Sequence, residues 1–303
     1  MDRQRERHHK CNHRTRTKGM SMFSIIICSI DDRKSARIQA HYRALLAGHA
    51  HEIILIRDAK SLSEGYNRGF AQSSGDTLIF SHDDIEILSD DFAPRLLQHL
   101  NTHDVVGVAG TTRLVGPTWN GAGQPHMHGC ITHRLPASFL FECFGPPSAK
   151  VQAIDGVFMV ARRKVLEAIP FDEVTFDGFH LYDLDFSYRV HLAGFSIAVP
   201  WDIMIIHDSM GNFDAVWQDY GRRFLAKHRA RLPEVKRGQR AWASVNLPSI
   251  EEVKARHLRM ITNRTTALEM DDASAGATAD PLDPFWQSAL LELPVCIPHS
   301  AWL

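Results

Sequence analysis

Strand-like and helix-like segments alternate along the first third of this chain, and this alternation limits the possible folds more than any other feature. Phe23–Cys28 is continuously apolar and largely β-branched, which is typical of a strand buried on both faces of a parallel sheet. Ser35–Ala47 then places apolar residues at helical spacing. The same alternation continues through the strands Glu52–Ile56, Thr77–Phe80 and Val105–Ala109 and the helices Leu62–Ser73 and Asp90–Leu100. The pattern predicts an α/β fold, a doubly wound and mostly parallel sheet with helices on both faces.

The alternation breaks between Thr111 and Lys150, where glycine and proline recur among aromatic residues. Long irregular segments are usually functional or disordered, and the aromatic residues argue against plain disorder. We therefore expect a loop or hairpin that covers an acceptor site. Its His126 and His128 are compatible with acceptor, metal or structural roles. Regular patterns return in the strands Gly156–Ala161, Phe195–Val199 and Ile203–Ile206 and the helices Arg163–Ala168, Leu181–Ala193 and Asp214–His228.

The two ends of the chain differ in composition from its middle. Residues 1–20 carry many basic residues and no apolar run, which indicates a disordered tail rather than a secretory signal. Beyond residue 232 the periodic signal weakens, and Asp271–Asp283 is rich in Ala, Asp, Ser and Gly, as linkers are. We therefore expect one domain over residues 21–232, followed by a partly linker-like C-terminal extension over residues 233–303.

The charge balance and the cysteine content limit the partners and the cellular compartment that we expect for this protein. The chain has 34 Lys and Arg against 35 Asp and Glu, and this balance gives no reason to expect nucleic acid as a partner. Its five cysteines are scattered without a Cys-x-x-Cys pair, which favours reduced thiols. No apolar stretch approaches the ~20 residues of a membrane-spanning helix. We expect a cytoplasmic protein without a transmembrane segment, and peripheral association with the inner face of the membrane stays open.

Acidic residues follow the third predicted strand, at the edge where doubly wound sheets bind their ligands. His82, Asp83 and Asp84 come directly after this strand. Carboxylates in that position suit a hard divalent cation that bridges phosphate oxygens. A plain turn, in which the Asp side chains bond local backbone groups, is an alternative interpretation of the same residues.

Two further groups in the second half of the chain are candidates for chemistry. Asp183 and Asp185 lie at the start of a predicted helix, two residues apart, so they point to different sides and only one faces a crevice. Acidic residues at a helix N-terminus also serve the helix dipole, so one of the pair is expected to be structural. His207 follows the apolar run Ile203–Ile206, and a neutral imidazole is a competent metal ligand, although a single His is more often structural.

Taken in order, a series of stretches across two-thirds of the chain resembles one known family. The stretches are Ile53–Asp58, Glu64–Gly69, Gly75–Asp84, Asp155–Arg163, Phe171–Glu173, Tyr182–Arg189 and His207. In order and spacing the series resembles the GT-A-fold glycosyltransferases of the large family-2-like group, and the ordered series is far more specific than any one stretch. The resemblance implies a GT-A-type nucleotide-sugar-binding fold. It also implies sugar transfer from a nucleotide-sugar donor to an acceptor hydroxyl, dependent on a divalent cation, Mn²⁺ or Mg²⁺.

The resemblance assigns donor-binding roles residue by residue. Asp58 takes the place of an Asp that contacts the nucleobase, and Tyr66 replaces an Arg in a stretch that runs along the nucleotide. The donor-binding set that it implies is Ser29, Asp31, Asp58, Asn67, Gly69, Asp83 and Gly156. The donor that it implies is a UDP- or GDP-type nucleotide sugar, and the acceptor is a glycan, a lipid-linked molecule or a protein.

The resemblance also implies the metal ligands and the base. His82 stands in place of the first Asp of the Asp-x-Asp metal motif, and Tyr182 stands in place of the Glu of a Glu-Asp pair. The metal ligands that it implies are Asp84, His207 and His82. Asp183 matches the general base, which takes the proton from the acceptor hydroxyl as the anomeric configuration inverts. We expect Arg189 or a nearby cation to help keep this carboxylate ionised.

Two alternative functions stay open. A sugar nucleotidyltransferase shares the fold class and the metal, but it needs a glycine-rich loop after the first strand, where Ser29–Arg33 contains no glycine. A degenerate, non-catalytic nucleotide or glycan binder fits the replacements at His82 and Tyr182 within the motifs. Pure binding would not require the retained Asp84, Asp183 and His207 together, which favours the enzyme.

Overall fold

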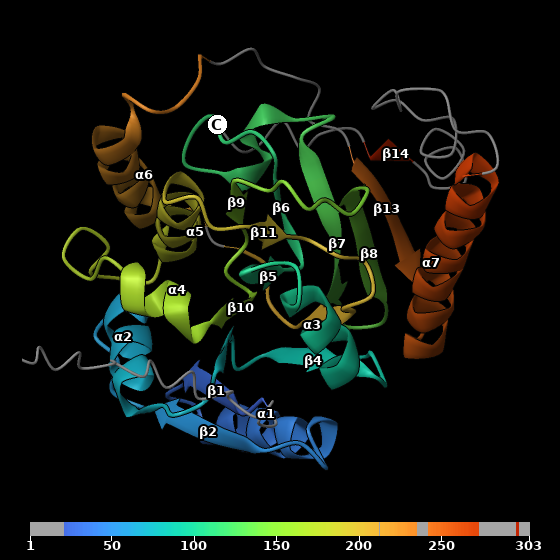
Figure 1. Ribbon diagram of the computed structural model, residues 1–303, viewed down its shortest axis with the longest axis horizontal. Coiled ribbons are helices and arrows are strands. Elements are labelled where there is room, and N and C mark those ends of the chain that lie inside the picture. The colour runs from blue at the N-terminus through green and yellow to red at the C-terminus, as the bar shows by residue number, and fades with distance from the viewer. Residues whose placement is uncertain (1–20, 212, 235–241, 273–294, 297–303) are drawn as a thin grey trace, which may run out of the picture.

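The computed structural model describes residues 21–211, 213–234, 242–272 and 295–296 of the 303-residue chain. The basic tail predicted for residues 1–20 lies outside the described residues, as does most of the predicted linker, from residue 273 onwards. The described residues form two sheets with helices packed around them (Figure 1).

A mixed six-stranded sheet carries the first half of the fold. Its strands, in spatial order, are β11 (Ile197–Ala198), β5 (Val105–Gly107), β10 (Phe158–Arg162), β3 (Thr77–Ser81), β1 (Phe23–Cys28) and β2 (His51–Ile56). β1 pairs in parallel with β2 and β3, and β11 pairs in parallel with β5. β10 runs antiparallel between β3 and β5. The carboxyl ends of β1, β2 and β3 therefore lie together along one edge, where a ligand site is expected.

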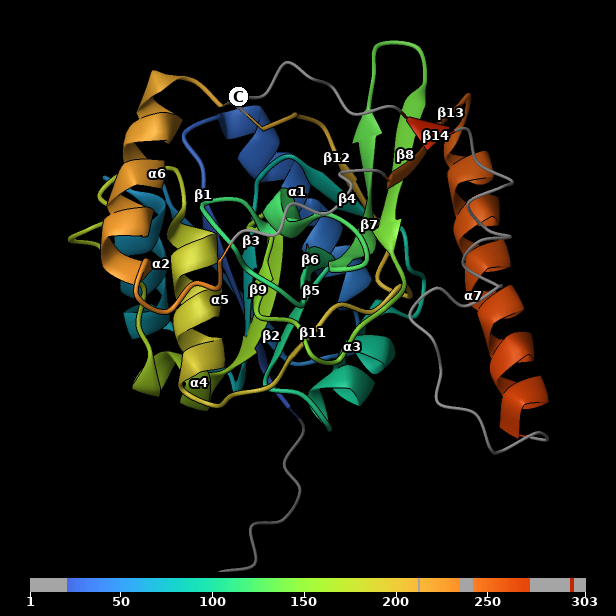
Figure 2. The same ribbon diagram turned by 90° about the horizontal axis from the view of Figure 1, so that it is seen from above.

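Helices cover both faces of this sheet (Figure 2). They are α1 (Asp32–Leu45), α2 (Leu62–Gln72), α3 (Phe92–Leu100), α4 (Arg163–Ala168) and α5 (Tyr182–Leu192). Alternate residues of β1 show the two layers, because side chains alternate between the faces of a strand. Ile25 and Ile27 belong to the core that includes residues of α1 and α3, whereas Ile26 packs in the core that includes residues of α2, α4 and α5. The predicted α/β architecture, with helices on both faces, is confirmed.

A second sheet packs beside the first. Its strands, in spatial order, are β14 (Val295–Cys296), β13 (Trp242–Leu247), β8 (Phe139–Gly145), β7 (Met127–Arg134), β12 (Ile205–His207) and β4 (Ile85–Ile87). β6 (Ala109–Thr111) also pairs with β7, and β9 (Ala153–Ile154) pairs with β6. The prediction of one strand over Val105–Ala109 is wrong, because the chain passes from the first sheet to the second at Val108. One apolar run thus supplies a short strand to each sheet.

The irregular segment between Thr111 and Lys150 contains the short 3₁₀ helix η1 (Trp119–Ala122) and the hairpin of β7 and β8. The expected hairpin is therefore present, and its role at an acceptor site stays a prediction. His128 lies on β7, where it is buried and its Nδ1 is 2.8 Å from the carbonyl oxygen of Pro146. This contact gives His128 a structural role in the hairpin.

Two more helices complete the described chain. α6 (Ala215–His228) packs near α5, and α7 (Ile250–Asp272) packs against the second sheet, at the far right of Figure 1. Val253 and Met260 of α7 share a buried core with Phe141 of β8 and Ile206 of β12. Within the described ranges, none of the helices has the length and apolar character of a membrane span.

Candidate active site

A pocket of about 250 Å³ lies beside the carboxyl ends of β1, β2 and β3. Apolar side chains from these strands and from α2 form part of its wall, and the polar turn after β3 forms another. The lining residues include Cys28, Ser29, Arg57, Tyr66, His82, Asp83, Asp84 and Phe179. Burial raises the pKa of the Cys28 thiol to about 12, so this sulfur stays protonated and serves as wall rather than nucleophile. The pocket occupies the edge at which the sequence predicts ligand binding.

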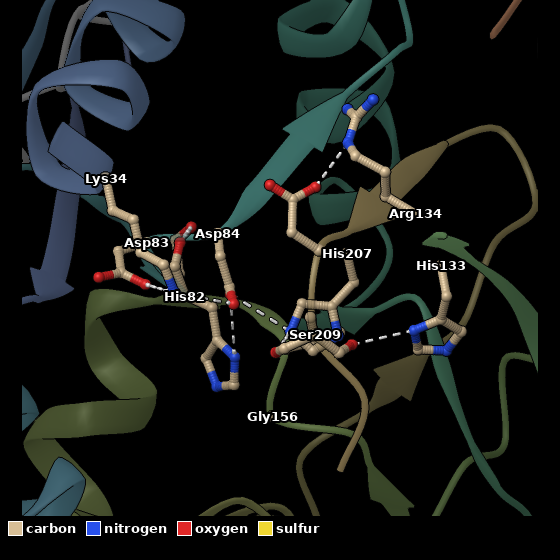
Figure 3. Close-up of polar contacts among 12 residues, drawn as sticks. Lys34, His82, Asp83, Asp84, His133, Arg134, Gly156, His207 and Ser209 are labelled. Carbon is tan, nitrogen blue, oxygen red and sulfur yellow. Dashed lines mark hydrogen bonds and ion pairs between the residues drawn. The ribbon is translucent and has the colours of Figure 1, made fainter. Parts of the chain in front are cut away.

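Three side chains with metal-ligating atoms meet beside this pocket (Figure 3). His82 and Asp84 come from the turn between β3 and β4, and His207 is the last residue of β12. β12 pairs antiparallel with β4 and sets His207 opposite Ile85, next to Asp84. Asp84 Oδ1 lies 3.3 Å from His207 Nε2 and 3.9 Å from His82 Nδ1, and the ligating atoms all lie within 4.8 Å of one another. The fold thus brings together the three residues that the resemblance named, and their role as ligands stays a prediction.

The charge states of this cluster suit a cation. Burial alone would raise the pKa of Asp84, but the hydrogen bond and charge of His207, with His82 and Ser209 adding to them, lower it well below the ordinary range. Burial and the neighbouring His207 lower the pKa of His82, which favours a neutral imidazole. One carboxylate with two imidazole rings is a donor set that fits a divalent cation.

Asp183 occupies the first turn of α5. The residue at the helix start, Leu181, has a left-handed backbone with φ of 61°. This conformation is rare for residues with a β-carbon and marks local strain of the kind found at functional sites. Burial, followed by the charge of Asp155, raises the pKa of Asp183 to about 7. A carboxylate that titrates near neutral pH is well matched to take up a proton during catalysis.

Asp185, the other acidic residue of this helix turn, lies in a different environment. Its fully buried carboxylate lies 2.7 Å from Arg189 Nε, 2.6 Å from Lys227 Nζ and 2.7 Å from His228 Nε2. Asp185 therefore ties α5 to α6, which is the structural role predicted for one member of the pair. The expectation that Arg189 keeps Asp183 ionised is wrong, because the Arg189 guanidinium is held by Asp185.

The predicted donor-binding residues of the loops fall into two groups. Ser29 and Asp83 line the pocket, and Ser29 Oγ donates a hydrogen bond of 2.6 Å to Asp83. Asp31 caps α1, where its carboxylate accepts two backbone N–H bonds. Asp58 is largely exposed and pairs with Arg68 at 2.9 Å. Contact between a nucleotide and Asp31 or Asp58 stays a prediction.

The other three predicted donor-binding residues make packing contacts. Asn67 bonds the backbone N–H and carbonyl of Phe171, at 3.0 and 2.9 Å. A β-carbon at Gly69 would overlap the side chain of Ile26, and one at Gly156 would lie 2.7 Å from the Cβ of Asp183. The two glycines therefore allow α2 and α5 to approach their neighbours closely, and nucleotide contact by these residues stays a prediction.

Sequence reasoning assigned no role to three groups that the structure places at the site. Lys34, in the first turn of α1, has its Nζ 3.4 Å from the carboxylate of Asp84. Asp155 raises the pKa of Asp183, and the Tyr182 hydroxyl lies 2.9 Å from His82 Nε2. Asp155 is the first residue of the matching stretch Asp155–Arg163, so its presence at the site could have been predicted from the sequence. The other contacts join elements that are far apart in the sequence, so no local pattern indicates them.

Comparison with known proteins identifies the family of the chain. A model described as "Glycosyltransferase like family" matches residues 24–228, more than half of the chain. No curated protein gives a significant match.

Three solved structures show limited similarity to the chain. Mannosyltransferase PcManGT from Pyrobaculum calidifontis, in complex with GDP-Man and Mn²⁺, is 11% identical with a TM-score of 0.43 over 70% of this chain and 64% of that one. GalNAc-T7 with UDP, GalNAc and Mn²⁺ is 10% identical with a TM-score of 0.43 over 69% and 48%. S. aureus TarS 1–349 is 12% identical with a TM-score of 0.38 over 69% and 72%. The alignments thus span less than two-thirds of the first two proteins. On the family match, which covers the whole predicted motif series, the chain belongs to the glycosyltransferase-like family.

Proposed function

We propose that this protein transfers a sugar from a nucleoside diphosphate donor to an acceptor hydroxyl, with inversion at the anomeric carbon and with a bound divalent cation. The observation that carries the proposal is the position of Asp183. Its pKa is raised to about 7, and it lies against Gly156, whose carbonyl oxygen accepts a bond from the Tyr182 hydroxyl. Tyr182 in turn contacts His82. The candidate base, Asp183, and the candidate cation site at His82 are therefore linked through Gly156 and Tyr182.

The pocket beside the strand ends supplies the donor site. Its apolar walls suit a nucleobase, and the Asp83 carboxylate, which lines the pocket, would accept hydrogen bonds from ribose hydroxyls. Lys34, 3.4 Å from the carboxylate of Asp84, and Arg57, in the pocket wall, add positive charge that would attract the donor's diphosphate. These features favour a UDP- or GDP-type nucleotide sugar without selecting one base.

His82, Asp84 and His207 would hold the cation, because their ligating atoms converge and their charge states suit it. When bound, a divalent cation neutralises the charge that develops on the leaving diphosphate. Asp183 takes the proton of the acceptor hydroxyl as that oxygen attacks the anomeric carbon, and Asp155 keeps the proton affinity of Asp183 high. Attack from the face opposite the leaving group gives inversion.

The acceptor is a glycan, a lipid-linked molecule or a protein, and the hairpin of β7 and β8 is the proposed cover of its site. We propose a cytoplasmic location, with lipid-linked acceptors reached from the inner face of the membrane. The alternative of a non-catalytic binder is disfavoured by the two like-charged, partly buried carboxylates of Asp155 and Asp183, because their repulsion costs stability and binding alone does not need it. The family match leaves the sugar nucleotidyltransferase without support.

Release of free nucleotide from a panel of UDP- and GDP-sugars, with Mn²⁺ or Mg²⁺ and with chelator, tests the proposal. We expect metal-dependent release from one donor in the presence of an acceptor, and loss of release in Asp183→Asn with donor binding retained. Asp219→Asn, a partly exposed residue on α6, is the matched control and should keep full activity. Loss of donor binding in Asp183→Asn, or undiminished release, would show that Asp183 is not the base.

A further inference from the structure

Two of the three positions at which the chain departs from the family motifs, His82 and Tyr182, touch each other. His82 and Tyr182 are separated by a hundred positions in the sequence, yet His82 Nε2 lies 2.9 Å from the Tyr182 hydroxyl. The same hydroxyl donates to the carbonyl oxygen of Gly156 at 3.2 Å. The Tyr182 side chain is buried against aromatic residues that include Tyr66 of α2 and Phe171 of the segment between α4 and α5. The two replacements therefore form one structural unit.

The hydrogen bonds of Tyr182 fix the tautomer of His82. A phenol carries one proton, and a carbonyl oxygen can only accept. Tyr182 satisfies both contacts only when it donates to Gly156 and accepts from His82. His82 Nε2 must then carry the proton, and His82 Nδ1 presents a lone pair. This assignment follows from the partners alone, as the tautomer of a histidine is set by the bond that its other nitrogen makes.

The lone pair of His82 Nδ1 faces the carboxylate of Asp84, 3.9 Å from Asp84 Oδ1. His207 Nε2 lies 3.3 Å from the same oxygen and 3.0 Å from the Ser209 hydroxyl oxygen. Figure 3 shows the three side chains converging on one point. Two electron-rich atoms without a proton between them are stabilised by a shared cation, and an oriented imidazole is a stronger ligand than a free one.

We propose that Tyr182 is a positioning residue that holds His82 as a metal ligand through Nδ1, and that the resulting two-imidazole, one-carboxylate site selects a first-row transition ion such as Mn²⁺ over Mg²⁺. The proposal rests on the proposed function, since it concerns the cation of the same site. Imidazole nitrogen suits transition ions, whereas Mg²⁺ prefers oxygen ligands in octahedral geometry. An Asp at position 82 would give a site richer in oxygen.

Binding of Mn²⁺ alone, without donor, measures this directly. The electron paramagnetic resonance signal of free Mn²⁺ is lost on binding, and Mg²⁺ competition in the same samples gives the selectivity. Four proteins form a double-mutant cycle: the full chain, Tyr182→Phe, His82→Asp and the double variant. Tyr188→Phe is the matched control, because Tyr188 lies on the same helix and its hydroxyl bonds the carbonyl of Arg231 away from the cluster. Thermal melts establish that each variant is folded.

We expect Tyr182→Phe to weaken Mn²⁺ binding about tenfold, the usual effect of removing a partner behind a metal-bound histidine. In the His82→Asp background the same change should cause no further loss, and His82→Asp alone should lower the preference for Mn²⁺ over Mg²⁺. The comparison of His82→Asp with the full chain retains Tyr182, so it tests the selectivity for Mn²⁺ over Mg²⁺ even if Tyr182→Phe fails to fold. The proposal would be overturned if the full chain bound no Mn²⁺ or if Tyr182→Phe left Mn²⁺ binding unchanged. It would also be overturned if Tyr182→Phe caused equal losses with His82 and with Asp at position 82, or if His82→Asp left the metal selectivity unchanged.

Donor turnover separates this inference from the proposed function. Metal-dependent nucleotide release by the full chain, together with unchanged Mn²⁺ affinity in Tyr182→Phe, would leave the transferase standing and remove the role of Tyr182. The expected coupling between positions 82 and 182, with no release from any donor and acceptor, would support the metal unit and count against sugar transfer.

Discussion

The pKa values of Asp183 and Asp185, two acidic residues on one helix turn, shift in opposite directions. Burial and the charge of Asp155 raise the pKa of Asp183, whereas burial at Asp185 is outweighed by His228, Arg189 and Lys227, which lower its pKa. A raised pKa means that the carboxylate is poor in compensating cations and ready to accept a proton, and a lowered one means that it is already satisfied. Position on the helix surface therefore separates the proposed base from a structural anion.

The raised pKa of Asp183 predicts the pH dependence of the reaction. Asp183 accepts a proton only when it is ionised, so kcat/KM should rise with pH through about 7 and then level off. Asp155→Asn removes a neighbouring charge that raises this pKa, so the rising limb should move to lower pH. The measurement is kcat/KM from about pH 5 to 9. A limb that stays in place in Asp155→Asn, or a rate that does not depend on pH, would contradict the assignment.

The residues of the site differ in how visible they are in the sequence. Asp84 and His207 follow strands and match an ordered motif series, so their convergence was predictable. The contact between His82 and Tyr182 was not, because both positions look like losses from the motifs until the fold places them together. Lys34 was missed for the same reason, since a lysine in the first turn of a helix carries no signal of the carboxylate opposite it.

At the scale of elements, α5 is held against α6 by a buried ion cluster around Asp185. Asp185→Asn would leave Lys227, Arg189 and His228 without their shared carboxylate. Breaking a buried pair from one side costs about 3–5 kcal/mol. We expect the free energy of unfolding, measured by urea denaturation at neutral pH, to fall by that amount. Asp183→Asn should cost far less, and equal losses in the two variants would mean that the cluster does not hold the helices together.

The approach of α5 to the sheet depends on Gly156. A β-carbon at this position would lie 2.7 Å from Asp183 Cβ and even closer to the Tyr182 hydroxyl. Gly156→Ala should displace the start of α5, lower kcat/KM strongly and destabilise the fold by about 1–3 kcal/mol, as overpacking does. Gly116→Ala is the control, because a β-carbon there meets no atom within 4 Å. Parallel kinetics and denaturation check both, and normal activity in Gly156→Ala would show that the close approach is not required.

The elements themselves were predictable where one period dominates the sequence. The buried strands of the first sheet and helices α1, α2 and α5 were expected from continuous apolar runs and helical spacing. The passage of one run from β5 into β6 was not, because nothing local in Val105–Thr111 indicates a change of sheet. β13 and α7 were also missed, since their apolar residues gain a partner only when the second sheet is assembled.

For the molecule as a whole, the second sheet joins the site to the C-terminal part of the chain. His207 lies on β12, and Ile206 beside it shares a core with Val253 and Met260 of α7. Residues 242–261 belong to the predicted extension, yet they pack in one core with strands of the predicted domain. β12, which carries the proposed metal ligand His207, is therefore packed against α7, a helix late in the described chain.

The interface between α7 and the second sheet contains an unusual buried histidine. His257 is 1% exposed, its ring packs edge-on against Phe141 at 5.2 Å, and neither ring nitrogen has a hydrogen-bond partner among the described residues. Burial lowers its pKa to about 4, with the charge of Asp202 acting weakly in the other direction. The neutral ring is thus tolerated in the core, and the protonated ring is not.

This histidine predicts acid sensitivity of the whole fold. Because the folded-state pKa is depressed below the ordinary ~6.5, the stability that depends on neutral His257 is fully present above about pH 6.5 and is lost as the pH falls toward 4. The loss amounts to about 3 kcal/mol at most. Urea denaturation of the full chain at stepped pH values should therefore show a steeper decline in unfolding free energy than in His257→Leu, which keeps an apolar side chain of similar size in the core. The same substitution at His103, a partly exposed residue after α3, should leave the decline unchanged. Parallel pH curves for the full chain and His257→Leu would mean that protonation of this ring does not govern the packing of α7.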